Sequence, residues 1–245
     1  MTTNESKRLA YTKRVNSLSS EISSINQQAH NITNRIERLN DHVHSLPTRI
    51  TRIRQGNYRV LTHLEVDQGL LLEMWTKLSP DIRATTLQKS GTVQSQTSAL
   101  QRALAQKQRR TVYNLGNLRD VESRLAELRL NLSELQGYVA SSLTPLEKRY
   151  QQIDRDLQLA ESTVTLVSQA SFPWKEGETP VMATKAKDLV NDREGVITLT
   201  NHRFIYELEK EIVLKKRFFI VTEKKNVREV VIQKPIGMIT RLTKG

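Results

Sequence analysis

The feature that most constrains the fold of this 245-residue chain is a seven-residue repeat of apolar side chains near its N-terminus. From Val15 to Ile53 the apolar residues are separated alternately by three and four positions, over five heptads. This spacing places one narrow apolar stripe along a helix and is typical of a coiled-coil seam. The stripe consists of Val15, Leu18, Ile22, Ile25, Ala29, Ile32, Ile36, Leu39, Val43, Leu46, Ile50 and Ile53.

A second stripe of the same spacing occupies residues 118–167. Two consecutive four-residue steps meet at Leu146, next to Pro145, and predict a local unwinding or hinge of the helix. In the first stripe, Pro47 predicts a kink or break near Ser45-Leu46. The second stripe consists of Leu118, Val121, Leu125, Leu128, Leu132, Leu135, Val139, Ser142, Leu146, Tyr150, Ile153, Leu157, Ala160, Val164 and Val167.

The segment between the two stripes is less regular. It contains a dense apolar patch over residues 60–78, and Ser79-Pro80-Asp81 resembles a helix start with Pro in the first turn. Residues 84–99 are rich in Thr, Ser and Gln, so we predict a weak helix there. Residues 1–170 are therefore expected to form a mainly α, coiled-coil region, either an antiparallel helical hairpin or an open bundle of three to four helices.

The lengths of these helices predict self-association. The first stripe covers 39 residues, about 58 Å at about 1.5 Å per residue, whereas residues 81–169 are more than twice as long. The first helix alone cannot cover that length, and an uncovered apolar stripe needs another partner. A homo-oligomer, most simply a dimer, is the expected result.

The composition changes near residue 171, where aromatic and β-branched residues become frequent. The pattern predicts a small antiparallel β-domain over residues 171–245, with a two-residue turn at Asn201-His202 and a polar turn at residues 223–226. The fold class is thus a long helical stalk followed by a small β-domain. The predicted strands are residues 195–200, 203–208, 212–221, 227–232 and 236–242.

The segment GVITLTNHRFIYE (residues 195–207) resembles the GRAM and bacterial PH-like families. In these families a Gly opens a strand, followed by alternating apolar residues, Leu-Thr-Asn, a variable residue, Arg and an aromatic. The resemblance implies that the Thr-Asn-x-Arg segment is structural. It also implies a PH-like barrel, which residues 173–245 are too few to complete, so the domain is minimal, incomplete or only a β-meander. The matching positions are Gly195, Ile197, Leu199, Thr200, Asn201, Arg203, Phe204, Ile205 and Tyr206.

The chain is strongly basic, with a net charge of +12. Residues 1–110 carry +9 (17 basic, 8 acidic), residues 111–170 carry −2 (6 and 8) and residues 171–245 carry +5 (15 and 10). Such a charge attracts anionic lipid, nucleic acid or acidic proteins, although long helices also use Lys and Arg for solubility. The candidate anion-binding residues are Arg203, Lys215, Lys216, Arg217, Lys224, Lys225, Arg49, Arg52, Arg54, Lys107, Arg109 and Arg110.

The sequence contains no recognisable catalytic motif. It has no Cys, no spacing of His residues suited to a metal, and no phosphate-binding Gly-rich loop. Acidic groups such as Asp154/Asp156 and Glu207/Glu209/Glu211 are expected to lie on the surface. We therefore expect a protein that is not an enzyme and that holds no cofactor and no metal.

The expected function is that of a non-catalytic, oligomeric scaffold or adaptor. Its basic β-domain would dock on a partner protein or on an anionic membrane surface. A nucleic-acid-associated protein that grips phosphates non-specifically, and a subunit of a larger assembly without a ligand of its own, are the alternatives. The N-terminus shows no secretory signal, and no stretch is long and apolar enough to span a bilayer. We therefore expect a cytoplasmic location, or a peripheral one on the inner membrane surface.

Overall fold

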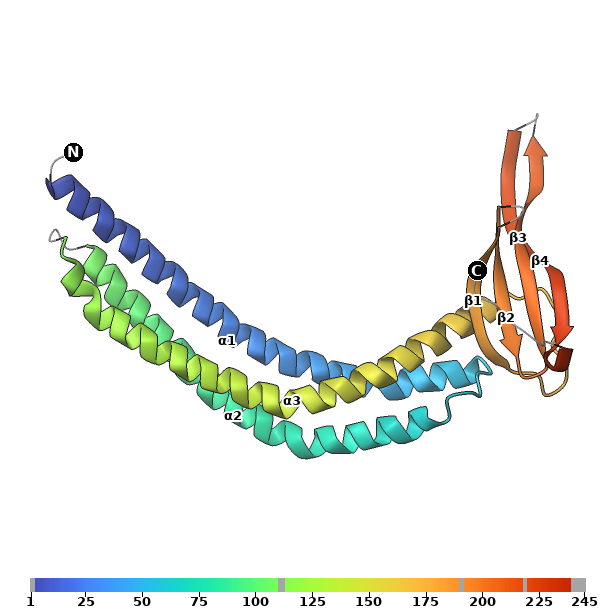
Figure 1. Cartoon of the computed structure of the whole chain (residues 1–245), viewed down its shortest axis with the longest axis horizontal. Helices are drawn as coiled ribbons and strands as arrows, with labels where there is room; N and C mark the ends of the chain where they lie inside the picture. Colours follow the sequence, from blue (N-terminus) through green and yellow to red (C-terminus); the bar gives the residue numbers. More distant parts are fainter. Residues whose placement is uncertain (1–2, 110–112, 190–191, 218–219, 239–245) are drawn as a thin grey trace. The chain divides into compact units, whose positions relative to one another are not determined.

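The computed structural model describes residues 3–109, 113–189, 192–217 and 220–238, and in the strands it describes only the backbone of residues 212–226. Three long α-helices precede a four-stranded antiparallel sheet, which confirms the predicted fold class (Figure 1). The helices are α1 (Thr3–Gln55), α2 (His63–Gln108) and α3 (Arg119–Val167), and the strands are β1 (Pro180–Asp188), β2 (Arg193–Thr200), β3 (Arg203–Arg217) and β4 (Ile220–Pro235).

The chain divides into two compact units. Residues 1–44 and 71–150 form the helical unit, and residues 45–70 and 151–245 form the sheet unit, which includes the remaining ends of the three helices. This division differs from the predicted boundary at residue 170, because each unit contains segments from several helices.

Polar contacts give the helix directions in the helical unit. The Nε of Arg14 lies 2.7 Å from Glu122, and the Nε of Arg35 lies 2.7 Å from Glu147, so α1 and α3 run in the same direction. Helix α2 runs the opposite way, because Trp75 donates to the Asn40 amide oxygen at 3.2 Å whereas the backbone carbonyl of Lys107 accepts from the Tyr11 hydroxyl at 3.1 Å. The unit is therefore a three-helix bundle, one of the two predicted arrangements.

The predicted seam residues form the core of the helices. Sixteen of the seam positions predicted above are buried within the single chain, so α3 does not carry the uncovered stripe from which we predicted self-association. The homo-oligomer stays a prediction without that support. The buried positions are Val15, Leu18, Ile22, Ile25, Ile32, Ile36, Leu39, Val43, Leu118, Leu125, Leu128, Leu132, Leu135, Val139, Ile153 and Leu157.

Each long helix continues through a proline. Pro47, Pro80 and Pro145 all lie inside helices, so the predicted helix start at Ser79-Pro80-Asp81 is wrong, and α1 has no break at Pro47. A proline inside a helix costs about 3 kcal/mol. The buried apolar neighbours of each proline offset this cost, as Leu46 does beside Pro47.

The irregular step in the α3 stripe lies seven residues, about two turns, earlier than predicted. Leu143 is fully buried whereas Ser142 is only partly buried, so two four-residue steps meet at Val139 rather than at Leu146. The sequence pattern placed Ser142 in the seam because a strict 3–4 alternation required it. Burial of a larger apolar side chain decided the position.

The middle of α2 has a polar core. Thr86, Ser90 and Thr97 are buried, whereas only Val93 is a buried apolar residue between Ile82 and Leu100. Because hydroxyl groups occupy these buried positions, α2 has less apolar packing than α1 and α3. The same residues are the reason why the sequence predicts only a weak helix over residues 84–99. The helix forms because its neighbours supply the apolar surface.

We expect Thr86→Val to stabilise the helical unit by about 1 kcal/mol. The Thr86 hydroxyl is buried without a hydrogen-bond partner in the described part of the chain, and Val removes it at nearly constant volume. Thr97→Val is the matched control, because the Thr97 hydroxyl donates to the carbonyl of Val93 at 2.7 Å. Thermal unfolding followed by circular dichroism measures both, and an equal gain in both variants would contradict the assignment.

The sheet is an antiparallel meander with the order β1-β2-β3-β4. The predicted turn at Asn201-His202 connects β2 to β3, but the predicted turn at residues 223–226 is wrong because these residues lie inside β4. β3 also continues past the expected break after Leu208. Residues 236–238 form a 3₁₀ helix rather than a strand, and residues 239–242 lie outside the described part of the chain.

One face of the sheet packs against the last turns of α3. Ala183 and Val196 form an apolar cluster with Val167, and the backbone N–H of Ala183 donates to the Thr163 hydroxyl at 3.1 Å. The alternation of buried and exposed residues along β2 and β3 fits a sheet covered on one side.

Candidate functional site in the sheet unit

The turn between β2 and β3 is fixed by side chains. The Asn201 amide oxygen accepts from the N–H of Thr179 at 2.8 Å, and its NH₂ group donates to the carbonyl of Gly177 at 3.0 Å. The Thr200 hydroxyl accepts from the N–H of Arg203 at 2.9 Å and donates to Glu178 at 2.8 Å. These contacts tie the turn to the segment before β1, and they give Thr200 and Asn201 a structural role.

Arg203 and Glu178 form a buried ion pair beneath this turn. The Nε and Nη2 of Arg203 each lie 2.8 Å from a Glu178 oxygen, and the two side chains are 4% and 0% exposed. Nη2 also donates to the carbonyl of Pro173 at 2.6 Å, and the guanidinium lies 5.2 Å from the centre of the Phe172 ring. This corrects the assignment of Arg203 to the anion-binding set, because its guanidinium is buried and already bound by a carboxylate.

The environment of Glu178 strongly favours its charged form. Burial by itself raises the pKa of the Glu178 carboxyl. Hydrogen bonds from Arg203, from the N–H of Lys175 and from Thr200 together outweigh burial and lower the pKa to about 2. The carboxylate therefore stays charged at every pH at which proteins normally work. The ion pair therefore connects the linker that follows α3 to the sheet.

Glu207 is a second buried carboxylate, and the sequence analysis placed it wrongly on the surface. It is 0% exposed, and its Oε1 accepts from both the N–H and the hydroxyl of Ser171 at 2.7 Å. Among the described residues, its other oxygen has no hydrogen-bond partner. The signal that could have found it is the period of two along β3, because Arg203, Ile205 and Glu207 share the covered face.

Several basic candidates in the helices are held in ion pairs. Arg49 contacts Glu161 at 2.8 Å and Asp154 at 2.6 Å, and the hydrogen bond that Arg49 donates to Glu161 is the main cause that raises the Arg49 pKa despite burial. Arg54 binds Glu65 at 2.7 Å and three backbone carbonyls of the α1–α2 connection, those of residues 58, 60 and 61.

The remaining basic candidates fall into four groups. Lys107 pairs with Asp120 at 3.1 Å, while Arg52 and Arg109 are exposed. Arg110 lies outside the described residues. The other five candidates belong to the part of β3 and β4 whose backbone alone is described: Lys215, Lys216, Arg217, Lys224 and Lys225.

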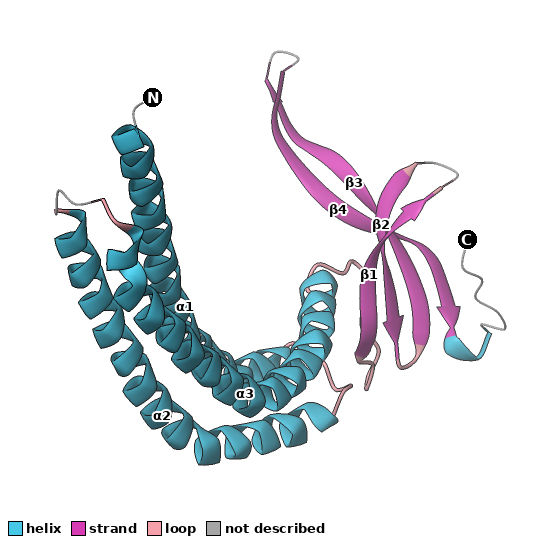
Figure 2. Ribbon diagram, turned by 60° about the vertical axis from the view of Figure 1, so that its left-hand side comes forward, coloured by secondary structure: helices cyan, strands magenta, loops and turns pink. Residues whose placement is uncertain are grey.

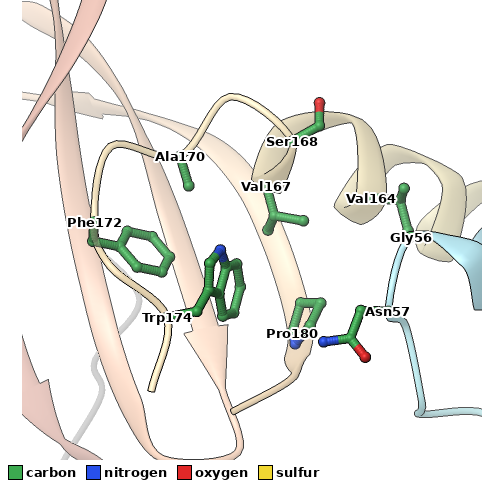
Figure 3. Close-up of a pocket in the computed structure, with 9 residues that line it drawn as sticks. All are labelled: Gly56, Asn57, Val164, Val167, Ser168, Ala170, Phe172, Trp174 and Pro180. Carbon is green, nitrogen blue, oxygen red and sulfur yellow. The ribbon is translucent and has the colours of Figure 1, made fainter. Parts of the chain in front are cut away.

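A pocket of about 400 Å³ lies beside the linker between α3 and β1 (Figure 3). Two aromatic rings contribute to it, Phe172 and Trp174, with their centres 4.9 Å apart. Gly56 is required near it, because a Cβ atom there would lie 2.4 Å from Val164. The lining carries no charged side chain, so the pocket suits an apolar group. It is lined by Gly56, Asn57, Val164, Val167, Ser168, Ala170, Phe172, Trp174 and Pro180.

Among the residues that the structure describes, no group of three or more His, Asp or Glu side chains is placed to hold a metal ion. Within the same ranges, no helix combines the length and apolar character needed to cross a bilayer.

Comparison of the chain with protein-family models, with curated proteins and with solved structures returned no match. The resemblance to the GRAM and bacterial PH-like families therefore stays a prediction that rests on residues 195–207.

Proposed function

We propose that this protein is a non-catalytic scaffold in which a helical stalk carries a basic β-domain that docks on an anionic membrane surface. The observation that carries the proposal is the net positive charge of residues 171–245, taken together with the ion pairing of three basic candidates in the helices. In the helical segments the candidates Arg49, Arg54 and Lys107 are bound to carboxylates, whereas residues 171–245 keep a net charge of +5.

Two finer parts of the proposal rest on the sequence pattern. The heptad spacing supports coiled-coil packing of the helices. A homo-oligomer, most simply a dimer, is proposed as well, although the seam residues are already buried within one chain. The GVITLTNHRFIYE segment supports a GRAM or PH-like relationship of the sheet. Sedimentation equilibrium of the full chain tests the oligomer, and a mass equal to the monomer at all concentrations would reject it.

The membrane proposal is tested by co-sedimentation of the full chain with vesicles at about 0.15 M salt. We expect binding to vesicles of equal parts phosphatidylserine and phosphatidylcholine, and none to pure phosphatidylcholine, because Lys and Arg near an anionic surface gain electrostatic energy. Equal binding to both compositions, or to neither, would reject anionic lipid as the partner.

Nucleic acid is the competing partner. It predicts an affinity for DNA or RNA that falls steeply with salt and shows little sequence preference. A short DNA duplex in the same assay is therefore the comparison, and preference for the duplex over the anionic vesicle would favour this alternative.

A further inference from the structure

We propose that a two-stranded ribbon, formed by residues 209–217 of β3 and 220–228 of β4, is the element that docks on the anionic bilayer. This inference rests on the proposed function and names the element that performs it. It starts from a difference in strand length. β2 pairs with β3 only as far as Gly195 opposite Leu208, whereas β3 and β4 remain paired from Leu208 to Arg217 opposite Ile220.

The ribbon extends well past the sheet. Nine further residues in each strand correspond to about 30 Å at about 3.3 Å per residue. Figure 2 shows β3 and β4 continuing as a pair where β1 and β2 no longer accompany them. Two strands alone are at best marginally stable in water, and both of their outer edges carry unpaired backbone groups. A ribbon of this length is therefore expected to bind to another surface.

The positive charge of the ribbon is concentrated in its distal part. At the base the charges cancel, because Lys210 pairs with Glu229 and Arg228 lies 3.7 Å from Glu209. The distal residues, 212–217 and 220–226, contain five basic residues and one acidic residue. Their net charge of +4 is a third of the +12 of the whole chain, in 13 of its 245 residues. The complement of this charge is a dense anionic surface.

The register of the two strands also indicates the kind of anionic surface. Five pairs are formed in the distal part, and in four of them a cation lies directly opposite Val or Ile. Residues directly opposite one another in an antiparallel pair share a face of the ribbon. The four pairs are Ile212 with Lys225, Val213 with Lys224, Lys216 with Val221, and Arg217 with Ile220.

This pairing mixes aliphatic and basic residues along the ribbon instead of separating them into an apolar and a charged face. A protein partner would favour a separate apolar patch. A bilayer interface accommodates the mixture, because Lys and Arg reach lipid phosphates while aliphatic groups lie at the acyl boundary. Nucleic acid would use the cations but would gain little from the four aliphatic partners.

The test compares two variants of the full chain that lose the same charge. The ribbon variant carries Lys215→Gln, Lys216→Gln and Arg217→Gln, and the control carries Arg52→Gln, Arg59→Gln and Arg109→Gln, three exposed cations outside the ribbon. Each basic residue near an anionic surface contributes roughly fivefold to affinity, so we expect the ribbon variant to bind phosphatidylserine vesicles about 100-fold more weakly. The control should keep most of the wild-type affinity.

A second variant, Lys224→Gln with Lys225→Gln, repeats the test on β4, and circular dichroism confirms that each variant is folded. If the wild-type chain binds and the ribbon variants bind as tightly, the ribbon inference is wrong while the proposed function stands. An equal loss in the control overturns the inference as well, since it would report net charge alone. A wild-type chain that ignores the vesicles but binds a short DNA duplex overturns the proposed function itself.

Discussion

Replacing Arg203 by Met should destabilise the sheet unit by about 3–5 kcal/mol at neutral pH. Removing one member of a buried ion pair leaves an uncompensated charge, here the Glu178 carboxylate, which is 0% exposed. The variant also loses the bond to the Pro173 carbonyl and the contact with the Phe172 ring. Urea unfolding measures the change, followed by the fluorescence of Trp174 in a Trp75→Phe background, because the chain has two Trp residues.

The pH dependence separates this effect from a simple loss of packing. In the wild-type chain the folded-state pKa of Glu178, about 2, lies below the usual value, so the pair contributes its full stability above about pH 4.5 and loses it as the pH falls towards 2. Without Arg203, burial instead raises the pKa of Glu178, and protonation at low pH relieves the penalty. The difference between variant and wild type should therefore be largest at pH 7 and shrink towards pH 3.

Two controls accompany this prediction. Lys210→Met breaks an exposed pair with Glu229 and should change the stability of the sheet unit far less. The double variant Glu178→Gln with Arg203→Met removes both charges and should recover much of the lost stability. A destabilisation that is the same at pH 7 and pH 3, or that the double variant does not relieve, would show that the charge pair is not its cause.

Replacing Ile32, Ile36 and Leu39 together by Asn should abolish the cooperative unfolding of the helical unit. These side chains are at most 8% exposed, and truncating one such side chain typically costs about 2–5 kcal/mol. Buried amides add the cost of unsatisfied polar groups. Three such changes approach or exceed the roughly 5–15 kcal/mol total stability of a typical domain.

Far-UV circular dichroism with thermal unfolding reports this loss. The matched control replaces three exposed leucines of the helices by Asn: Leu9, Leu87 and Leu130, which are 61%, 76% and 60% exposed. The control should keep its helix content and its cooperative transition. Unchanged helicity in the seam variant would mean that the buried stripe does not hold the helices together.

Local patterns in the sequence predicted the elements and their inward faces. The spacing of Val15 to Ile53 predicted which face of α1 is buried, because a helix places residues three and four apart on the same side. Asn201-His202 predicted a turn for a similarly local reason, since Asn readily adopts turn conformations. The change of composition near residue 171 predicted the transition from helices to strands.

Residues distant in the sequence decided what those patterns could not. Whether Pro80 ends a helix depends on the apolar surface that neighbouring helices offer α2, and whether residues 223–226 turn or extend depends on pairing with β3. In the same way, the sequence predicted that Arg203 binds an anionic ligand and that Glu207 lies on the surface. Both predictions are wrong because Glu178 binds Arg203 and Ser171 binds Glu207 in the folded chain. The helical stalk, the β-domain and most of the buried stripe of the helices follow from local sequence patterns. The tertiary structure decides which charges are paired, because ion pairs and strand register join residues that no local period connects.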